Sequence, residues 1–143
     1  MEKIAALKNI NEFCQNSMLT AIGIVITDFG NDFVSGKMPV DKRTVQPYGL
    51  LHGGATAAFA ESLGSIAGGM QVDRTVKSVV GIELNISHLK SVKSGWVFGK
   101  ATPVKIGRKI QVWNIDIKDE NDIPVSISRL TLAVIDNNSG KSF

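Results

Sequence analysis

The sequence has few of the residues on which several function classes depend. Its single cysteine, Cys14, excludes an intrachain disulfide and favours a reducing compartment. Two histidines far apart in the chain, with that one cysteine, do not make a zinc site. One tyrosine, two tryptophans and no long run of lysine or arginine leave little for base stacking or for tracking a phosphate backbone. Nucleic acid is therefore not an expected partner.

Membrane and secretion signals are also missing. No apolar run reaches the roughly 18 residues that a membrane-spanning helix needs. The N-terminal segment MEKIAALKNINEF is charged and lacks the long apolar stretch of a signal peptide. We therefore expect a cytoplasmic protein with no membrane association. A net charge of +3 is mild and is compatible with an anionic small-molecule ligand.

The length of 143 residues and a hydrophobic content of 43% predict a single domain with one core, residues 1–143. Residues 1–18 are expected to be an N-terminal helical segment, because apolar side chains recur there at three-residue spacing. They are Ile4, Leu7, Ile10 and Phe13. Residues 137–143 are polar and are expected to form a flexible tail.

Residues 53–68 are the most informative segment, with the sequence GGATAAFAESLGSIAG. Nearly every side chain in it is small or apolar, and a helix that is apolar all round is normally buried. Glu61 is its only charged residue, and no lysine or arginine lies within four positions of it. A lone buried carboxylate costs free energy unless it is paired, hydrogen-bonded or protonated. We therefore expect Glu61 to be buried and to be functional.

Alternating apolar and polar residues predict strands on both sides of this helix. The predicted strands cover residues 22–26, 33–38, 80–88, 96–104, 110–117 and 123–135. An antiparallel sheet with one face in water needs a cover for the other face, and the small helix side chains allow a close approach. The predicted fold class is α+β, a curved antiparallel sheet of about six strands wrapped around one long central helix.

The start of the helix offers an oxyanion site. The N–H groups of Gly53 and Gly54 have no partner within the helix, and the helix dipole adds positive potential there. Glu61 lies eight residues from Gly53, which is roughly 12 Å along a helix axis. A carboxylate and an amide must both reach one reacting carbonyl group, so one helix cannot supply both. The pattern therefore predicts a homodimer with two composite sites.

Plainer structural roles remain open for each candidate residue. Glu61 could be a structural carboxylate that accepts hydrogen bonds from Ser62 or Ser65, or a carboxylate exposed at the edge of the helix. His52 could pack against Tyr48. The remaining alternatives are a turn role for Gln46, which precedes Pro47, and a core role for His88, which is in phase with an apolar strand face.

Four stretches resemble the hotdog-fold acyl-CoA thioesterases, over most of the chain from about Leu19 to Ile135. They are MPVDKRT at 38–44, QPYGLLHGGATAAFAESLGSIAG at 46–68, VVGIELNISHLK at 79–90 and GRKIQVW at 107–113. The sequence is most similar to the branch that contains the Glu-type 4-hydroxybenzoyl-CoA thioesterase and the 1,4-dihydroxy-2-naphthoyl-CoA hydrolase of menaquinone synthesis.

The resemblance implies roles for the residues that match. Glu61 would be the nucleophile or the general base, and the Gly53 N–H would bind the thioester carbonyl oxygen. Gln46 and His52 would orient or polarise the thioester, and Ser65 would position Glu61 or a water molecule. The family uses no metal or redox cofactor and forms tetramers from two dimers, with the sites at the dimer interface.

The resemblance also implies a binding surface for the coenzyme A part of the substrate. That surface would comprise Gly81, His88, Leu89, Lys90, Ser91, Lys105, Ile106, Gly107, Arg108, Lys109 and Ile110. The basic residues among them could bind the nucleotide phosphates or could be ordinary solubilising charge. Leu50, Phe59, Leu63 and Ile66 are expected to line the acyl pocket.

The predicted function is therefore hydrolysis of an aromatic or medium-chain acyl-CoA to the free acid and CoA, with 1,4-dihydroxy-2-naphthoyl-CoA as the leading substrate. One alternative is a hydrolase that proofreads acyl groups on a carrier protein, because both substrates share the phosphopantetheine arm. The other is a non-catalytic acyl-CoA-binding protein.

Overall fold

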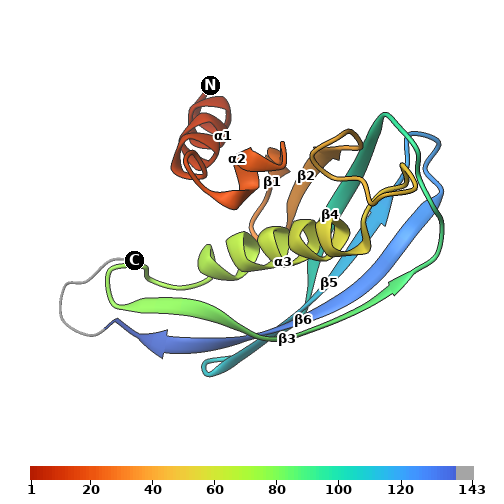
Figure 1. Ribbon diagram of the computed structural model, residues 1–143. Coiled ribbons are helices and arrows are strands. Elements are labelled where there is room, and N and C mark those ends of the chain that lie inside the picture. Colours follow the sequence, from red (N-terminus) through yellow and green to blue (C-terminus); the bar gives the residue numbers. More distant parts are fainter. Residues whose placement is uncertain (138–143) are drawn as a thin grey trace.

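The computed structural model describes residues 1–137 and shows a sheet that curves around one helix (Figure 1). The helices are α1 (Glu2–Phe13), α2 (Met18–Ala21) and α3 (Gly53–Gly69). The strands are β1 (Val25–Phe29), β2 (Val34–Pro39), β3 (Lys77–His88), β4 (Trp96–Ile106), β5 (Ile110–Lys118) and β6 (Pro124–Asp136). They form one six-stranded antiparallel sheet in the order β1-β2-β4-β5-β6-β3. The predicted α+β fold is confirmed.

The first strand begins later than predicted. Ile22 ends the short helix α2, and Gly23 follows it with φ +79°, a left-handed conformation that interrupts an extended segment. At the other end, the predicted tail starts at Asn137, whose N–H donates to the carbonyl of Val76 at 2.9 Å. Residues 138–143 of that predicted tail lie outside the described residues.

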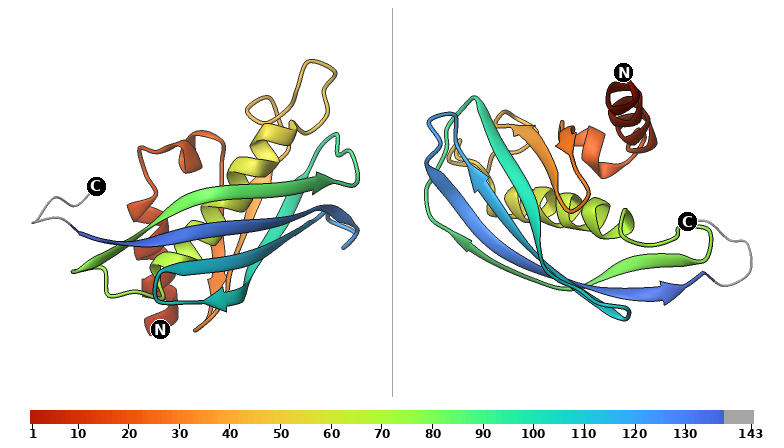
Figure 2. Two further views of the ribbon diagram at one scale, coloured as in Figure 1. Left: turned by 90° about the horizontal axis from the view of Figure 1, so that it is seen from below. Right: turned by 180° about the vertical axis from the view of Figure 1, so that it is seen from behind.

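The sheet is strongly curved, as both views in Figure 2 show. Four register shifts help it to curve, and they lie between Ile26 and Asp28 in β1, between Gly81 and Glu83 in β3, between Pro103 and Lys105 in β4, and between Ile117 and Lys118 in β5. A bulge bends its strand and increases the local twist. The concave face thus wraps one side of α3.

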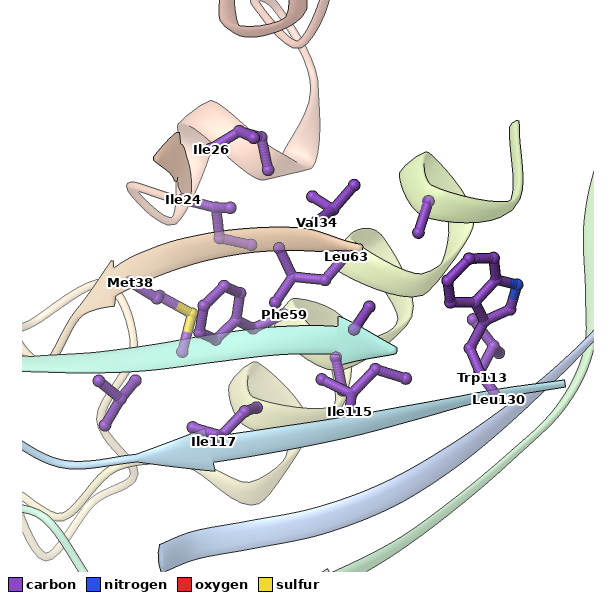
Figure 3. Close-up of a cluster of buried hydrophobic side chains, with 14 of the residues drawn as sticks. Ile24, Ile26, Val34, Met38, Phe59, Leu63, Trp113, Ile115, Ile117 and Leu130 are labelled. Atoms are coloured by element: carbon purple, nitrogen blue, oxygen red, sulfur yellow. The ribbon is translucent and has the colours of Figure 1, made fainter. Parts of the chain in front are cut away.

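The core lies between α3 and the concave face (Figure 3). Phe59 and Leu63 of the helix are fully buried there, together with Trp113, Ile115 and Leu130 of the sheet. The helix approaches closely because a Cβ at Gly64 would meet the side chain of Leu130, and the sheet contributes glycines as well. Gly36 and Gly99 leave room for Phe59 and Leu63. The two helix residues therefore belong to the core, and their predicted place in an acyl pocket is wrong for the single chain.

A buried polar chain joins the end of α3 to the sheet. Gln111 Nε2 donates to the carbonyl of Gly68 at 3.2 Å, and Trp113 Nε1 donates to Gln111 Oε1 at 2.9 Å. The oxygen and the NH₂ group of the fully buried Gln111 side chain thus each have a hydrogen-bond partner. None of the described helices is long and apolar enough to cross a membrane.

Candidate functional site

The start of α3 is built around His52, which is the residue before the first helical position. Its Nδ1 accepts a hydrogen bond from the Gly54 N–H at 2.7 Å, and its carbonyl accepts from the Thr56 N–H at 3.1 Å. A neutral imidazole whose Nδ1 accepts carries its proton on Nε2. His52 is exposed, so this Nε2–H is available to a ligand beside the helix start.

Gly53 presents the amide that the sequence singled out. No hydrogen bond among residues 1–137 uses its N–H, whereas the N–H of Gly54 is already occupied by His52. The free donor lies at the positive end of the helix dipole, where a developing oxyanion is stabilised. A Cβ at Gly53 would stand 3.0 Å from Nε2 of His88, so the imidazole of His88 lies directly against this glycine.

His88 is the last residue of β3 and comes to the helix start from the sheet. It is exposed, so the core role considered for it is wrong in the single chain. Its partner across the β3–β6 ladder is Ser126. We call Gly53, His52 and His88 the amide half-site.

Glu61 is exposed, and the prediction that it is buried in this chain is wrong. The concave sheet covers only one stripe of α3, and Glu61 lies outside that stripe, facing β3. The buried stripe consists of Thr56, Phe59, Ala60, Leu63, Gly64, Ala67 and Gly68. Glu61 Oε1 lies 3.0 Å from the place that a Cβ would take at Gly81, so the glycine makes room for the carboxylate. We call Glu61 and Gly81 the carboxylate half-site.

The Glu61 carboxylate takes part in no hydrogen bond or ion pair within the described part of the chain. Neither serine considered as its partner binds it there. Ser62 Oγ instead donates to the carbonyl of Ala58 at 2.7 Å, and Ser65 is half-buried one turn further along the helix. An unpaired, exposed carboxylate is chemically free to accept a proton or to attack a carbonyl carbon.

Gln46 closes the turn that precedes the helix. Its side-chain oxygen accepts a hydrogen bond from the Tyr48 N–H, and its own N–H donates to the carbonyl of Leu50 at 2.8 Å. The turn role considered for it is therefore present. Because the oxygen is occupied, the amide NH₂ is the group left for a ligand.

The two segments predicted to hold CoA lie at opposite ends of the sheet. The β-ladders place His88 level with Ser126, and Gly81 level with Leu132, Gln111 and Ile106. Residues 88–91 therefore follow the end of β3 near the helix start, whereas residues 105–110 form the turn at the far end. One chain cannot bring both to the same phosphate group.

The members of these segments differ in how they are engaged. Lys90 forms an ion pair with the buried Asp119, which lowers the pKa of that carboxyl group, helped by the N–H groups of Ile123 and Asn121. Gly107 N–H donates to the carbonyl of Ile110 at 2.9 Å and closes the far turn. The remaining members with exposed side chains are Leu89, Ser91, Lys105, Ile106, Arg108 and Lys109.

Asp119 is a residue whose role the sequence pattern missed. Its segment, DEND at 119–122, lies between the predicted strands 110–117 and 123–135, and its composition indicates only a turn. Asp119 Oδ1 accepts from the N–H of Asn121 at 2.8 Å and of Ile123 at 3.0 Å. An aspartate that begins a turn is the local signal for such bonds. Its ion pair with Lys90 has no signal in the sequence, because it depends on the pairing of β3 with β6.

Comparison with known proteins shows the family to which this chain belongs. A model of the thioesterase superfamily matches residues 48–126. The crystal structure of a thioesterase from Haemophilus influenzae has a TM-score of 0.90 and 46% sequence identity, covering 95% of this chain and 94% of that one.

Two further structures are those of variants of thioesterases from other bacteria. The one from Pseudomonas aeruginosa has a TM-score of 0.90 and 40% identity, covering 92% of this chain and 94% of that one. The one from Staphylococcus aureus has a TM-score of 0.80 and 31% identity, covering 82% of this chain and 97% of that one. The match to the family model and the similarity to these structures show that the chain belongs to the thioesterase superfamily. It is a hotdog-fold hydrolase of the thioesterase type.

Proposed function

We propose that two copies of this chain pair through their β3 strands and that each of the two resulting sites hydrolyses an aromatic or medium-chain acyl-CoA. The observation that carries the proposal is the placement of both half-sites along the same strand. Glu61 lies beside Gly81, in the first half of β3, and Gly53 lies beside His88, the last residue of β3. β3 is an edge strand, so its outer side is available to a second copy.

An antiparallel pairing of the two β3 strands would join complementary half-sites. Gly81 and His88 both face the helix side of the sheet, and a two-fold axis midway between them sets Gly81 of one copy opposite His88 of the other. Paired strands lie about 4.8 Å apart. The Glu61 carboxylate of one copy would then come next to the Gly53 N–H of its partner, and symmetry would build the same site twice.

The same pairing would gather the basic segments. Residues 105–110 are level with Gly81, and residues 88–91 follow His88. Setting Gly81 opposite the partner's His88 brings the far turn of one copy toward the 88–91 segment of the other. Arg108 and Lys109 would then meet the nucleotide phosphates of CoA as exposed, salt-sensitive charges.

The reaction follows from the groups in the composite site. The thioester carbonyl oxygen accepts the Gly53 N–H, and the helix dipole stabilises its developing negative charge. His52 Nε2–H and the Gln46 NH₂ orient the thioester from the same side. Glu61 either takes a proton from the attacking water or attacks the carbonyl carbon itself and forms an anhydride that water then cleaves. In both routes the C–S bond breaks, and the CoA thiolate leaves and takes up a proton.

The resemblance to the Glu-type branch makes 1,4-dihydroxy-2-naphthoyl-CoA the leading substrate of a cytoplasmic enzyme, with two dimers forming a tetramer. A thiol-release assay over aroyl, phenylacetyl, fatty acyl and 1,4-dihydroxy-2-naphthoyl esters of CoA tests this choice. We expect the aromatic esters to have the highest kcat/KM. Binding without thiol release would instead support the acyl-CoA-binding alternative.

Replacing Arg108 and Lys109 by alanine separates CoA substrates from carrier-protein substrates. Removing these charges should raise KM for CoA esters and leave turnover of an acylated carrier protein unchanged. Equal effects on both substrates would contradict a phosphate-binding role for this turn.

The role of Glu61 is tested by Glu61→Gln, which removes the charge and keeps the shape. We expect kcat to fall about 10²- to 10⁴-fold, with KM nearly unchanged. Ordinary activity in this variant would refute the assignment.

Mixing two inactive variants tests whether the site is shared between copies. Gly53→Pro removes the amide donor at the first helical position, where proline is well tolerated, and Gly53→Ala is the control that keeps the N–H. Reassociating equal amounts of Glu61→Gln and Gly53→Pro should restore about one quarter of wild-type activity, because half the dimers are hybrids with one intact site each. A site contained in one chain would give no recovery.

A further inference from the structure

Ser126 carries a polar group that the fold leaves without a partner. The residue is fully buried at the start of β6, and its Oγ has no hydrogen-bond partner among residues 1–137. A buried hydroxyl without a partner costs folding free energy that alanine would avoid. Such a group invites an explanation in terms of function.

The location of Ser126 connects it to the amide half-site. Ser126 is paired with His88 across the β3–β6 ladder, and directly opposed residues on one face have Cβ atoms about 4.5–5.5 Å apart. Figure 1 shows that β3 ends and β6 begins on the same side of the molecule as the start of α3. The His88 imidazole thus lies between this hydroxyl and Gly53.

The orientation of the imidazole decides which nitrogen each neighbour can reach. The ring atoms nearest to the Cβ position of Gly53 are Nε2 at 3.0 Å, Cε1 at 3.1 Å and Cδ2 at 3.6 Å. Nε2 is therefore directed at the helix start, and Nδ1 is left for the opposite side. No hydrogen bond within the described chain uses either nitrogen of His88.

We propose that Ser126 is a positioning residue that donates its hydroxyl hydrogen to Nδ1 of His88 and so keeps the proton of the neutral imidazole on Nε2. The His88 Nε2–H is then a second donor, beside the Gly53 N–H, for the thioester carbonyl oxygen. Two donors converging on one oxygen stabilise the oxyanion better than one. The inference rests on the proposed function, because the oxygen belongs to the thioester.

The chain supplies a matched control for this hydroxyl. Ser128 lies two residues further along β6, on the same face, and is also buried. Its Oγ donates to the carbonyl of Ile115 at 3.2 Å, so its hydrogen bond is already made within the sheet. Removing the Ser128 hydroxyl tests the general cost of a buried serine, and removing the Ser126 hydroxyl tests the proposed contact with His88.

The experiment compares Ser126→Ala with Ser128→Ala in the thiol-release assay, each alone and combined with His88→Gln. We expect Ser126→Ala to lower kcat about 10- to 100-fold with KM little changed, and Ser128→Ala to leave kcat near wild type. Because the effect of Ser126 acts through His88, Ser126→Ala should add little in the His88→Gln background. An unchanged kcat in Ser126→Ala, or an equal loss of kcat in the wild-type and His88→Gln backgrounds, would overturn the proposal.

A spectroscopic readout keeps this test independent of the proposed function. Long-range ¹H–¹⁵N correlation spectra report which nitrogen of His88 carries the proton, and we expect Ser126→Ala to shift the population away from the Nε2–H form. An unchanged tautomer would overturn the inference even in an active enzyme. Failure of the wild type to release thiol from any ester would instead refute the proposed function. If Ser126→Ala does not fold, Ser126→Cys provides the same comparison with a weaker donor.

Discussion

The two edges of the sheet are finished in different ways. At the β1 edge, Asn11 of helix α1 donates its side-chain amide to the carbonyl of Ile26 and accepts the Ile26 N–H, both at 2.9 Å. At the other edge, β3 is 12 residues long, and no strand within residues 1–137 pairs with its outer side. Val80 and Ile82 are 44% and 59% exposed there.

The contrast shows how one edge can be closed while the other stays available. The side-chain amide of Asn11 takes the place of a neighbouring strand, because it forms hydrogen bonds with both the N–H and the carbonyl of Ile26. A long edge strand with exposed apolar side chains is a template for association unless something covers it. In this chain the N-terminal helix covers β1, and the proposed dimer would cover β3.

The largest expected effect comes from placing a charge at the β3 edge, which we call the free edge. Ile82→Lys should weaken dimer association about 100-fold or more and reduce thiol release in parallel, because a buried unpaired charge opposes pairing. Val25→Lys on β1 is the matched control, since Val25 is also an exposed apolar strand residue, at 38%. Sedimentation equilibrium and activity would be measured together. A dimer that tolerates Ile82→Lys but dissociates with Val25→Lys would reverse the comparison.

A smaller effect is expected from opening the closed edge. Asn11→Ala removes the two bonds to Ile26 and a third, 3.0 Å bond to the carbonyl of Leu7. We expect the free energy of unfolding in urea to fall by about 1–3 kcal/mol. Larger species should also appear on size-exclusion chromatography, because β1 would become a second template. Asn9→Ala, on an exposed position of the same helix, should change neither quantity.

The fold could be predicted from the sequence because it depends on fixed local geometry, and the site shared between two copies, which depends on the same geometry, stays a prediction. The strand alternation and the small apolar residues of 53–68 were sufficient for a sheet wrapped around a helix. The rise of a helix per residue predicts that Glu61 and Gly53 lie too far apart to share a site within one chain. In the structure they lie beside different residues of β3, Gly81 and His88. These conclusions needed no knowledge of how the strands pair.

The features that the sequence could not predict depend on tertiary pairing. Glu61 was expected to be buried, but the composition of a helix does not say how wide a stripe the sheet covers. The closing role of Asn11 has no local signal, since its partner Ile26 lies in another element. The opposite locations of residues 88–91 and 105–110 follow from the strand order and register, which spacing along the chain does not contain.

The smallest expected effect concerns the point at which the free edge is tied to its own chain. Lys90, just after β3, binds Asp119, and this bond is the main reason why the pKa of Asp119 is lowered. A lowered native pKa stabilises the fold above the ordinary aspartate value of about 3.9, and the stabilisation is lost as the pH falls through the native pKa. Asp119→Asn should therefore lower the free energy of unfolding in urea at pH 7 and make it less dependent on pH between about 5 and 3. Asp116→Asn, on an exposed position of β5, is the control that should keep the wild-type acid slope. An Asp119→Asn variant with that same slope would mean that the end of β3 is held by the ladder with β6 alone.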